Sequence, residues 1–316
     1  MSAYFMYHMP SFTFRGVAPE GIFEHTAGLA QAAEAAGFDQ VTVMDHFYQI
    51  QTVGAETEPM LEAWTTLGAL AARTSRIRLG TLVTGVTYRN PAMLAKIATT
   101  LDVISGGRAV LGIGAAWNED EHIGYGFGFP PVRERMDRLE EALQIIKALF
   151  TEGDAEHRPS FEGRYYRIER ALNIPRPLRA GGPPVLVGGM GERRTLRLVA
   201  RYADISNFVP RPVEELKRGL QVLERHCEAE GRDPATILKT TMAPLILVRD
   251  EQEAKELADR LPPQVVARAR PVTSEQALPI LADLMEAGFG GFAFRNPNLS
   301  TPELIELAGD LKKQLG

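Results

Sequence analysis

The sequence predicts an α/β protein, a (β/α)8 TIM barrel in which eight parallel strands alternate with helices and insertions lie at the carboxyl-end mouth. Three observations support this class. The 316 residues, 45% of them hydrophobic, can bury one large core, and the chain exceeds the ~250 residues typical of the fold. Apolar runs of strand length recur along the chain, and amphipathic segments separate them almost to its end. An open, doubly wound sheet is the alternative.

The strands are predicted where short apolar runs are bounded by turn residues. They lie at residues 3–9, 40–44, 77–85, 109–114, 184–188, 203–208, 238–247 and 290–295. Helices are predicted where apolar residues recur at helical spacing, at 21–36, 61–74, 91–105, 132–150, 191–201, 212–230, 250–260, 274–287 and 302–314. Gly37 and Gly288 each follow a helical segment and precede an apolar residue, so we expect both to end a helix in the left-handed conformation.

Residues 151–184 interrupt this alternation. They include the run FEGRYY at 161–166 and a stretch rich in proline and glycine that ends at Pro184. We interpret the segment as an insertion with a small hairpin over one barrel mouth, because long loops in compact domains are usually excursions of this kind. The sequence therefore predicts a single barrel domain over residues 1–316.

Charge and cysteine content exclude several classes of partner. Lys and Arg total 35 against 40 Asp and Glu, a formal charge of -5, and the two signs are interspersed. Such a chain has no basic surface for nucleic acid or for an anionic membrane. Cys227 is the only cysteine, which leaves no intramolecular disulfide and no thiolate metal site. Without a signal-like N-terminus or a long apolar span, we expect a cytoplasmic protein that acts on a small molecule.

Asp45 and His46 directly follow the second predicted strand. The carboxyl ends of the strands form the active face of a (β/α)8 barrel, so this pair is expected at the site. An imidazole there can polarise a bound ring, and a neighbouring carboxylate can fix its tautomer or bind the ligand. The alternative is a loop pair that caps the next segment, and position alone leaves both interpretations open.

Gly188, Gly189, Met190 and Gly191 follow the apolar run 184–187 of the fifth predicted strand and precede a helical segment. A glycine-rich turn between a strand and a helix directs backbone N–H groups and the positive end of the helix toward a phosphate. The alternative is a tight turn without a ligand. The position of the loop on the active face favours phosphate binding.

The segment Gly112–Asn118 resembles a dinucleotide fingerprint but departs from it. Trp117 stands at its sixth position, and no acidic residue closes the next strand about 20 residues later, as that motif requires. We expect its glycines to allow something to approach the backbone closely, with Asn118 as a polar recognition group. The acidic cluster 118–122 is interpreted as a solvated helix start, and no metal site is predicted.

Together these motifs resemble the bacterial luciferase-like monooxygenase superfamily, and within it most closely the coenzyme F420-dependent oxidoreductases. The resemblance runs from about residue 21 to residue 207 and, more faintly, from 288 to 297. It is carried by residues 37–39 (GFD), 45–47 (DHF), 62–67 (EAWTTL), 71–75 (AARTS), 78–81 (RLGT), 88–91 (YRNP), 102–108 (DVISGGR), 112–114 (GIG), 133–141, 163–166 (GRYY), 187–191 (VGGMG) and 202–204 (YAD).

The resemblance implies a TIM barrel that binds its cofactor in the carboxyl-end mouth and forms a homodimer through barrel helices. It implies that His46 lies close to the reacting ring and that Asp45 contacts the ring. Leu82 and Val83 match the position of a non-prolyl cis peptide that bulges against the ring, and Thr84 would line the same pocket.

By the same resemblance, Asn118 would contact the cofactor and the 188–191 loop would hold its phosphate. Some F420-dependent sugar-phosphate dehydrogenases carry a catalytic glutamate just after the fourth strand, where this chain reads Ala115-Ala-Trp-Asn118. That substrate class is therefore not supported.

We expect an F420-dependent oxidoreductase with His46 as the catalytic residue and an unidentified small organic substrate. The first alternative is an FMN-dependent monooxygenase that uses oxygen and a flavin reductase partner. The second is a barrel that binds a flavin or deazaflavin without turnover.

Overall fold

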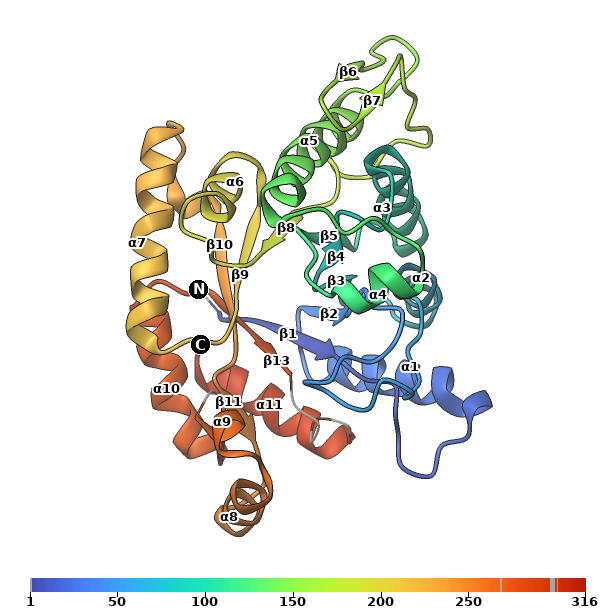
Figure 1. The fold of residues 1–316 in the computed structure, drawn as a ribbon. Helices are drawn as coiled ribbons and strands as arrows, with labels where there is room; N and C mark the ends of the chain where they lie inside the picture. The colour runs from blue at the N-terminus through green and yellow to red at the C-terminus, as the bar shows by residue number, and fades with distance from the viewer. Residues whose placement is uncertain (1, 268, 296–298, 300) are drawn as a thin grey trace.

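Figure 1 shows the computed structural model of the chain, which describes residues 2–267, 269–295, 299 and 301–316. The barrel strands form one parallel sheet in the order β3-β2-β1-β13-β10-β9-β8-β5-β4. The sheet closes into a barrel because β3 pairs with both β2 and β5. The strands are β1 (Tyr4–Met9), β2 (Gln40–Val43), β3 (Arg78–Thr81), β4 (Thr84–Gly85), β5 (Ala109–Gly114), β8 (Val185–Gly188), β9 (Ile205–Phe208), β10 (Leu238–Met242) and β13 (Gly291–Phe294). The predicted barrel is confirmed, with β3 and β4 sharing one of its eight positions.

Helices surround the barrel in the sequence order that the pattern predicts (Figure 1). They are α1 (Ile22–Ala35), α2 (Ala63–Arg73), α3 (Pro91–Ser105), α5 (Val132–Thr151), α6 (Thr195–Tyr202), α7 (Val213–Ala229), α10 (Ser274–Glu286) and α11 (Pro302–Gln314). The other helices are α4 (Glu119–Gly124), α8 (Glu251–Arg260), α9 (Pro263–Val266) and the 3-10 turns at Pro19–Gly21 and Pro234–Thr236. Among the described residues, no helix has the length and apolar character needed to span a bilayer.

The glycine at the end of α1 takes the predicted left-handed conformation. Gly37 has φ 85°, and the following Phe38 N–H donates to Ala33 O at 3.0 Å, which satisfies a carbonyl in the last turn. Gly288 does the same after α10, with φ 111°. Both helices therefore end where the sequence predicts, and each turns its chain directly into a barrel strand.

The insertion at 151–184 contains the predicted hairpin, formed by β6 (Phe161–Glu162) and β7 (Arg167–Ile168). The hairpin lies against α5, where the Glu141 carboxylate accepts backbone N–H groups from the hairpin turn at 2.8 to 3.0 Å. One predicted strand, 238–247, is wrong as a single element. Pro244 has no N–H to donate, and the chain divides there into β10 and β11 (Leu245–Leu247). β11 leaves the barrel and pairs with β12 (Arg270–Val272).

The barrel interior changes in character from apolar to polar along its axis. An apolar layer fills the middle, formed by Met6, Val110, Leu186, Ile205 and Ala293. Buried polar residues occupy the carboxyl-end half of the strands: His8, Thr42, Asn207 and Thr240. His8 Nδ1 lies 2.9 Å from Thr42 Oγ1, and Asn207 Nδ2 donates to Thr240 Oγ1 at 2.9 Å. This polar layer is the floor on which the candidate site is built.

Candidate active site

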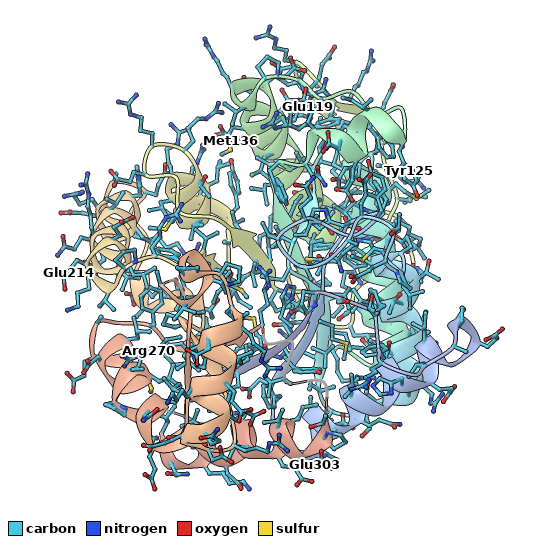
Figure 2. The ribbon with its side chains drawn as sticks, turned by 60° about the horizontal axis from the view of Figure 1, so that its bottom comes forward. Glu119, Tyr125, Met136, Glu214, Arg270 and Glu303 are labelled. Carbon is cyan, nitrogen blue, oxygen red and sulfur yellow. The ribbon has the colours of Figure 1, made fainter. Side chains whose placement is uncertain are left out.

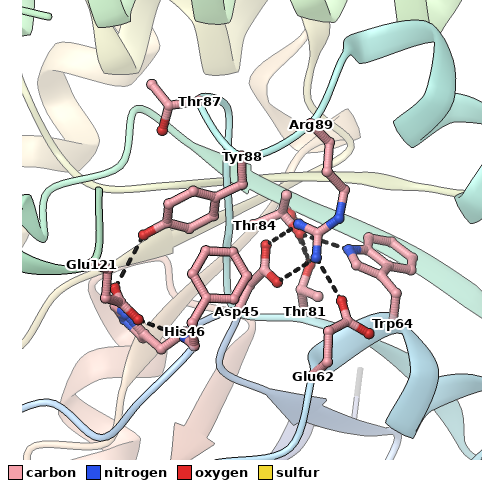
Figure 3. Close-up of polar contacts among 12 residues, drawn as sticks. Asp45, His46, Glu62, Trp64, Thr81, Thr84, Thr87, Tyr88, Arg89 and Glu121 are labelled. Carbon is pink, nitrogen blue, oxygen red and sulfur yellow. Dashed lines mark hydrogen bonds and ion pairs between the residues drawn. The ribbon is translucent and has the colours of Figure 1, made fainter. Parts of the chain in front are cut away.

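The predicted site residues lie where barrel strands end. Asp45 and His46 follow β2 by two and three residues, and Leu82 to Thr84 span the break between β3 and β4. Asn118 follows β5, and the 188–191 loop begins at the last residue of β8. These strands are neighbours in the closed sheet, so their carboxyl ends meet at one mouth. Figure 3 shows the polar contacts around Asp45 and His46.

Glu121 on α4 is the centre of one group of contacts. Its carboxylate lies 2.6 Å from His46 Nδ1 and accepts from the Tyr88 hydroxyl at 3.1 Å (Figure 3). It also accepts from the Phe47 N–H at 2.5 Å. Burial by itself raises the pKa of Glu121, but the contacts with His46, Phe47 and Tyr88 outweigh burial and hold that pKa below its usual value. Glu121 is therefore ionised at neutral pH.

Arg89 forms a second group of contacts with two carboxylates. Its guanidinium donates to both oxygens of Asp45, at 2.6 and 3.0 Å, and to Glu62 at 2.6 Å (Figure 3). Burial acts to lower the pKa of Arg89, but Asp45 and Glu62 outweigh it and raise that pKa. Burial raises the pKa of Asp45, and Arg89 opposes this shift. The Asp45 side chain is 1% exposed, so it lies behind the site surface in this structure.

Thr84 is also fully buried. Its hydroxyl accepts from Trp64 Nε1 at 3.1 Å and donates to Thr81 Oγ1 at 3.0 Å, and Thr81 in turn donates to Gly112 O at 2.8 Å. This chain of hydrogen bonds links α2 to β3, β4 and β5. Thr84 therefore supports the wall of the mouth from behind in this structure.

The Leu82-Val83 peptide is cis, as the resemblance implies. Both side chains are partly exposed, and Val83 packs against positions on β5 and β8 that lack a Cβ. A Cβ on Gly114 or Gly188 would come within 3.0 Å of a Val83 methyl group, and a Cβ on Gly112 would collide with Thr81 O. The sequence predicts that another group approaches the backbone of Gly112 and Gly114 closely. In the structure, that group is the chain's own segment 81–83.

Asn118 and the 188–191 loop retain unused hydrogen-bonding groups. Asn118 is the N-cap of α4, yet its side chain makes no capping bond there. Gly189 N–H donates to Asn207 O at 2.9 Å and is therefore already used. Between Met190 and Thr195, no backbone N–H donates to any other residue in the described part of the chain. An anion at the start of α6 would find donors in that stretch.

The interpretation of 118–122 as a solvated helix start is wrong for two of its residues. Glu119 and Asp120 are exposed, but Glu121 and His122 are 0% exposed because α4 turns them toward Tyr88. His122 Nε2 lies 2.7 Å from Thr87 Oγ1, and its Nδ1 lies 2.5 Å from Asn118 O. No group of His, Cys, Asp or Glu among the described residues is arranged to hold a metal ion.

Sequence reasoning did not assign a role to Glu121, Tyr88, Arg89, Glu62 or Trp64. Four of them, all except Glu121, belong to motifs that carry the family resemblance, so the motifs did contain a signal. The helical periodicity of α4 carries no such signal, because the helix has only six residues. The floor residue His8 was also missed. Burial, Arg295 and His46 together lower the pKa of His8 to about 3, so its imidazole is neutral.

Comparison with known proteins agrees with this geometry. The sequence profile described as luciferase-like monooxygenase matches residues 5–305. The F420-dependent glucose-6-phosphate dehydrogenase of Kineococcus radiotolerans is 34% identical over 303 residues, covering 86% of each chain. The enzyme of the same name from Nocardia farcinica is 31% identical over 313 residues, covering 88% of this chain and 90% of the relative.

Solved structures show the same fold. An F420-dependent secondary alcohol dehydrogenase in complex with an F420-acetone adduct superposes with a TM-score of 0.80 at 21% identity, over all of both chains. The EDTA monooxygenase of Chelativorans sp. BNC1 superposes with a TM-score of 0.85 at 16% identity, over all of this chain and 94% of its own. The profile match over nearly the whole barrel and the relatives above 30% identity lead to one conclusion: this chain belongs to the luciferase-like monooxygenase family.

Proposed function

We propose that this protein is a coenzyme F420-dependent oxidoreductase that transfers a hydride between the deazaflavin and a small organic substrate. The observation that carries the proposal is that relatives named F420-dependent dehydrogenases match almost the full chain at 31 to 34% identity. The fold alone would not suffice, because such barrels support many chemistries. The motifs shared with that branch also converge on the cluster around Asp45 and His46 (Figure 3).

The residues at the mouth fit such a cofactor. The partly exposed Leu82 and Val83 offer an apolar surface for a flat ring. The side-chain amide of Asn118, which makes no capping bond to α4, offers hydrogen bonds. The free N–H groups after Gly189 suit the phosphate. F420 would supply the hydride chemistry, and the protein would orient the reactants and exclude water.

His46 is the residue we assign to proton movement. Its side chain is 12% exposed, and its ring lies 5.6 Å from the ring of Trp117. Nδ1 is occupied by Glu121, whereas Nε2 has no hydrogen-bond partner among the described residues. An imidazole with one nitrogen fixed and the other free can hold or release a proton at the free nitrogen.

The substrate we propose is not a sugar phosphate, although that is the substrate named for the relatives. The region just after the fourth strand, where some such dehydrogenases carry a catalytic glutamate, reads Ala115-Ala-Trp-Asn118 here and offers no acid. Glu121 does not replace it, because its carboxylate is buried against His46. The exposed rim beside His46 is instead aromatic, with Trp117 59% exposed.

We also propose a homodimer through α3. Met93 and Ile104 are 59% and 55% exposed, and they lie eleven residues apart, about three helical turns, so they share one face. The segment 172–178 runs alongside, since Leu178 N–H donates to Asp102 of α3 at 2.9 Å. It adds the exposed side chains Ile174 and Leu178. Apolar residues grouped in this way favour a protein interface.

Equilibrium binding and turnover test the enzymatic proposal together. F420 should bind with a dissociation constant in the micromolar range or tighter, about -8 kcal/mol, and FMN at least tenfold more weakly. Absorbance of the deazaflavin should then change with one of a panel of alcohols, aldehydes and cyclic enones. Tighter binding of FMN than F420, with oxygen consumption, would replace the proposal by an FMN-dependent monooxygenase. F420 binding without turnover on any panel member would favour a carrier.

A further inference from the structure

Glu121 is buried and yet is held by donors from two separate segments. His46 and Phe47 come from the loop after β2, and Tyr88 comes from the loop between β4 and α3. Glu121 itself lies in the middle of α4, where its neighbour Glu119 faces solvent; Figure 2 labels Glu119 on the outside of the molecule. A buried carboxylate must be compensated, and here His46 provides the shortest side-chain contact, at 2.6 Å.

The ionised carboxylate can only accept hydrogen bonds. The hydrogen on the His46 ring must therefore lie on Nδ1 when the imidazole is neutral, which leaves the lone pair on Nε2. The backbone N–H of Phe47 binds the other carboxylate oxygen and prevents the carboxylate from rotating away. This geometry selects one tautomer of His46.

The other ionisable groups nearby are engaged elsewhere. Asp45 is bonded to Arg89, and His122 is paired with Thr87 and the Asn118 carbonyl. His8, below the mouth, is paired with Thr42 and is neutral at about pH 7 because its pKa is about 3. Tyr88 keeps its proton because burial raises its pKa. Among the described residues, Glu121 is thus the only acid in hydrogen-bonding contact with the His46 ring.

We propose that Glu121 is the positioning residue of this active site, and that it holds His46 in the Nδ1–H tautomer so that Nε2 can take up a proton during the reaction. The inference rests on the proposed function only for its kinetic consequence. The tautomer itself is a property of the protein without cofactor. It therefore has a test that does not depend on which cofactor binds.

The direct test is nitrogen NMR on protein labelled with ¹⁵N-histidine, with the His46→Ala variant identifying the His46 signals among the six histidines. Near pH 8 the parent should show His46 protonated at Nδ1 and unprotonated at Nε2. In Glu121→Gln, whose amide can donate as well as accept, the two tautomers should mix. A parent signal from the Nε2–H tautomer would overturn the proposal, even if the variant failed to fold.

Kinetics provide the second test. Glu121→Gln should lower the single-turnover rate of hydride transfer by at least about 10- to 100-fold, the loss seen when the carboxylate behind a metal-bound histidine is removed. The pH dependence of that rate should also change, because the carboxylate beside the imidazole has been removed. Cofactor affinity should stay within about threefold of the parent, a change of less than 1 kcal/mol.

Glu119→Gln is the matched control, since it removes the same charge from the same helix at an exposed position. It should leave both the rate and its pH dependence unchanged. Equal effects of the two variants would refute a specific role for Glu121. A slower Glu121→Gln enzyme with an unchanged pH profile and unchanged NMR signals would likewise refute it, because that result indicates a purely structural role.

Discussion

The guanidinium of Arg89 binds both carboxylate oxygens of Asp45, at 2.6 and 3.0 Å, across 44 residues of sequence. The two side chains are 14% and 1% exposed, so little water reaches the pair. A paired contact of this kind is strong and directional. It fixes the loop after β2, on which His46 lies, to the loop that leads into α3.

Arg89→Met should destabilise the protein by about 3 kcal/mol near neutral pH, because it leaves the Asp45 charge buried without its partner. Urea denaturation of parent and variant measures the change. The double variant Arg89→Met/Asp45→Asn is the control and should recover part of the loss. Equal stability of the parent and Arg89→Met would show that the pair contributes nothing.

His46→Ala should leave the barrel folded, since a partly exposed loop residue contributes little to the core. Hydride transfer should slow by about 10² to 10⁴-fold if Nε2 moves a proton in the transition state. Cofactor binding should weaken only modestly. Single-turnover oxidation of reduced cofactor at saturation gives the rate, and a value within a few-fold of the parent would leave His46 as a binding residue.

Gly189 tests the phosphate loop. Its φ of 109° strains any side chain, so Gly189→Ala and Gly189→Asp should lose similar stability, and the two variants differ chiefly by one negative charge. Gly189→Asp should bind F420 more weakly than Gly189→Ala by about 1 to 3 kcal/mol through repulsion of the phosphate. Calorimetric titration of both folded variants measures the difference. Equal affinities would indicate an ordinary turn.

His8 should make the fold sensitive to acid. Its pKa is about 3 in the folded protein against 6.5 in the unfolded chain, so between these values the unfolded state binds more protons. Stability should therefore fall as the pH drops below about 6.5, by roughly 2 kcal/mol at pH 5 for this group. His8→Asn should reduce that loss when denaturation is compared at pH 7 and pH 5. A loss of equal size in both proteins would assign the sensitivity to other groups.

Ile104→Glu should convert the proposed dimer to a monomer, because it places a charge in an apolar interface. Sedimentation velocity across a range of concentrations measures the molecular mass. Ile123→Glu, at a still more exposed position on α4, is the control and should remain dimeric. A parent that sediments as a monomer at all concentrations would refute the interface.

The barrel could be predicted because its signals are local. Each strand is a short apolar run, and glycines such as Gly37 and Gly288 mark helix ends within a few residues of the strand that follows. Pro244 interrupts one such run, and the predicted strand 238–247 wrongly included β11, which pairs with β12 outside the barrel. The error arose from merging two apolar runs that the missing N–H keeps apart.

The site was predicted only in part, because its contacts are distant in sequence. His46 and Asn118 could be placed at strand ends, but Glu121 lies 75 residues from His46 and within a run of acidic residues. Whether such a residue faces water or the protein depends on how α4 packs, which neither composition nor periodicity encodes. Arg89 and Glu62 were visible only as parts of shared motifs.

The contact between Val83 and the glycines opposite it means that the mouth cannot be redesigned one position at a time. Val83 methyl groups lie 3.0 and 3.1 Å from where a Cβ on Gly188 would sit, so an alanine at 188 becomes acceptable once position 83 is shortened. Position 112 offers no such exchange, since a Cβ there would collide with the backbone carbonyl oxygen of Thr81. A library that seeks to reshape this mouth should therefore vary positions 83, 114 and 188 jointly and leave position 112 as glycine.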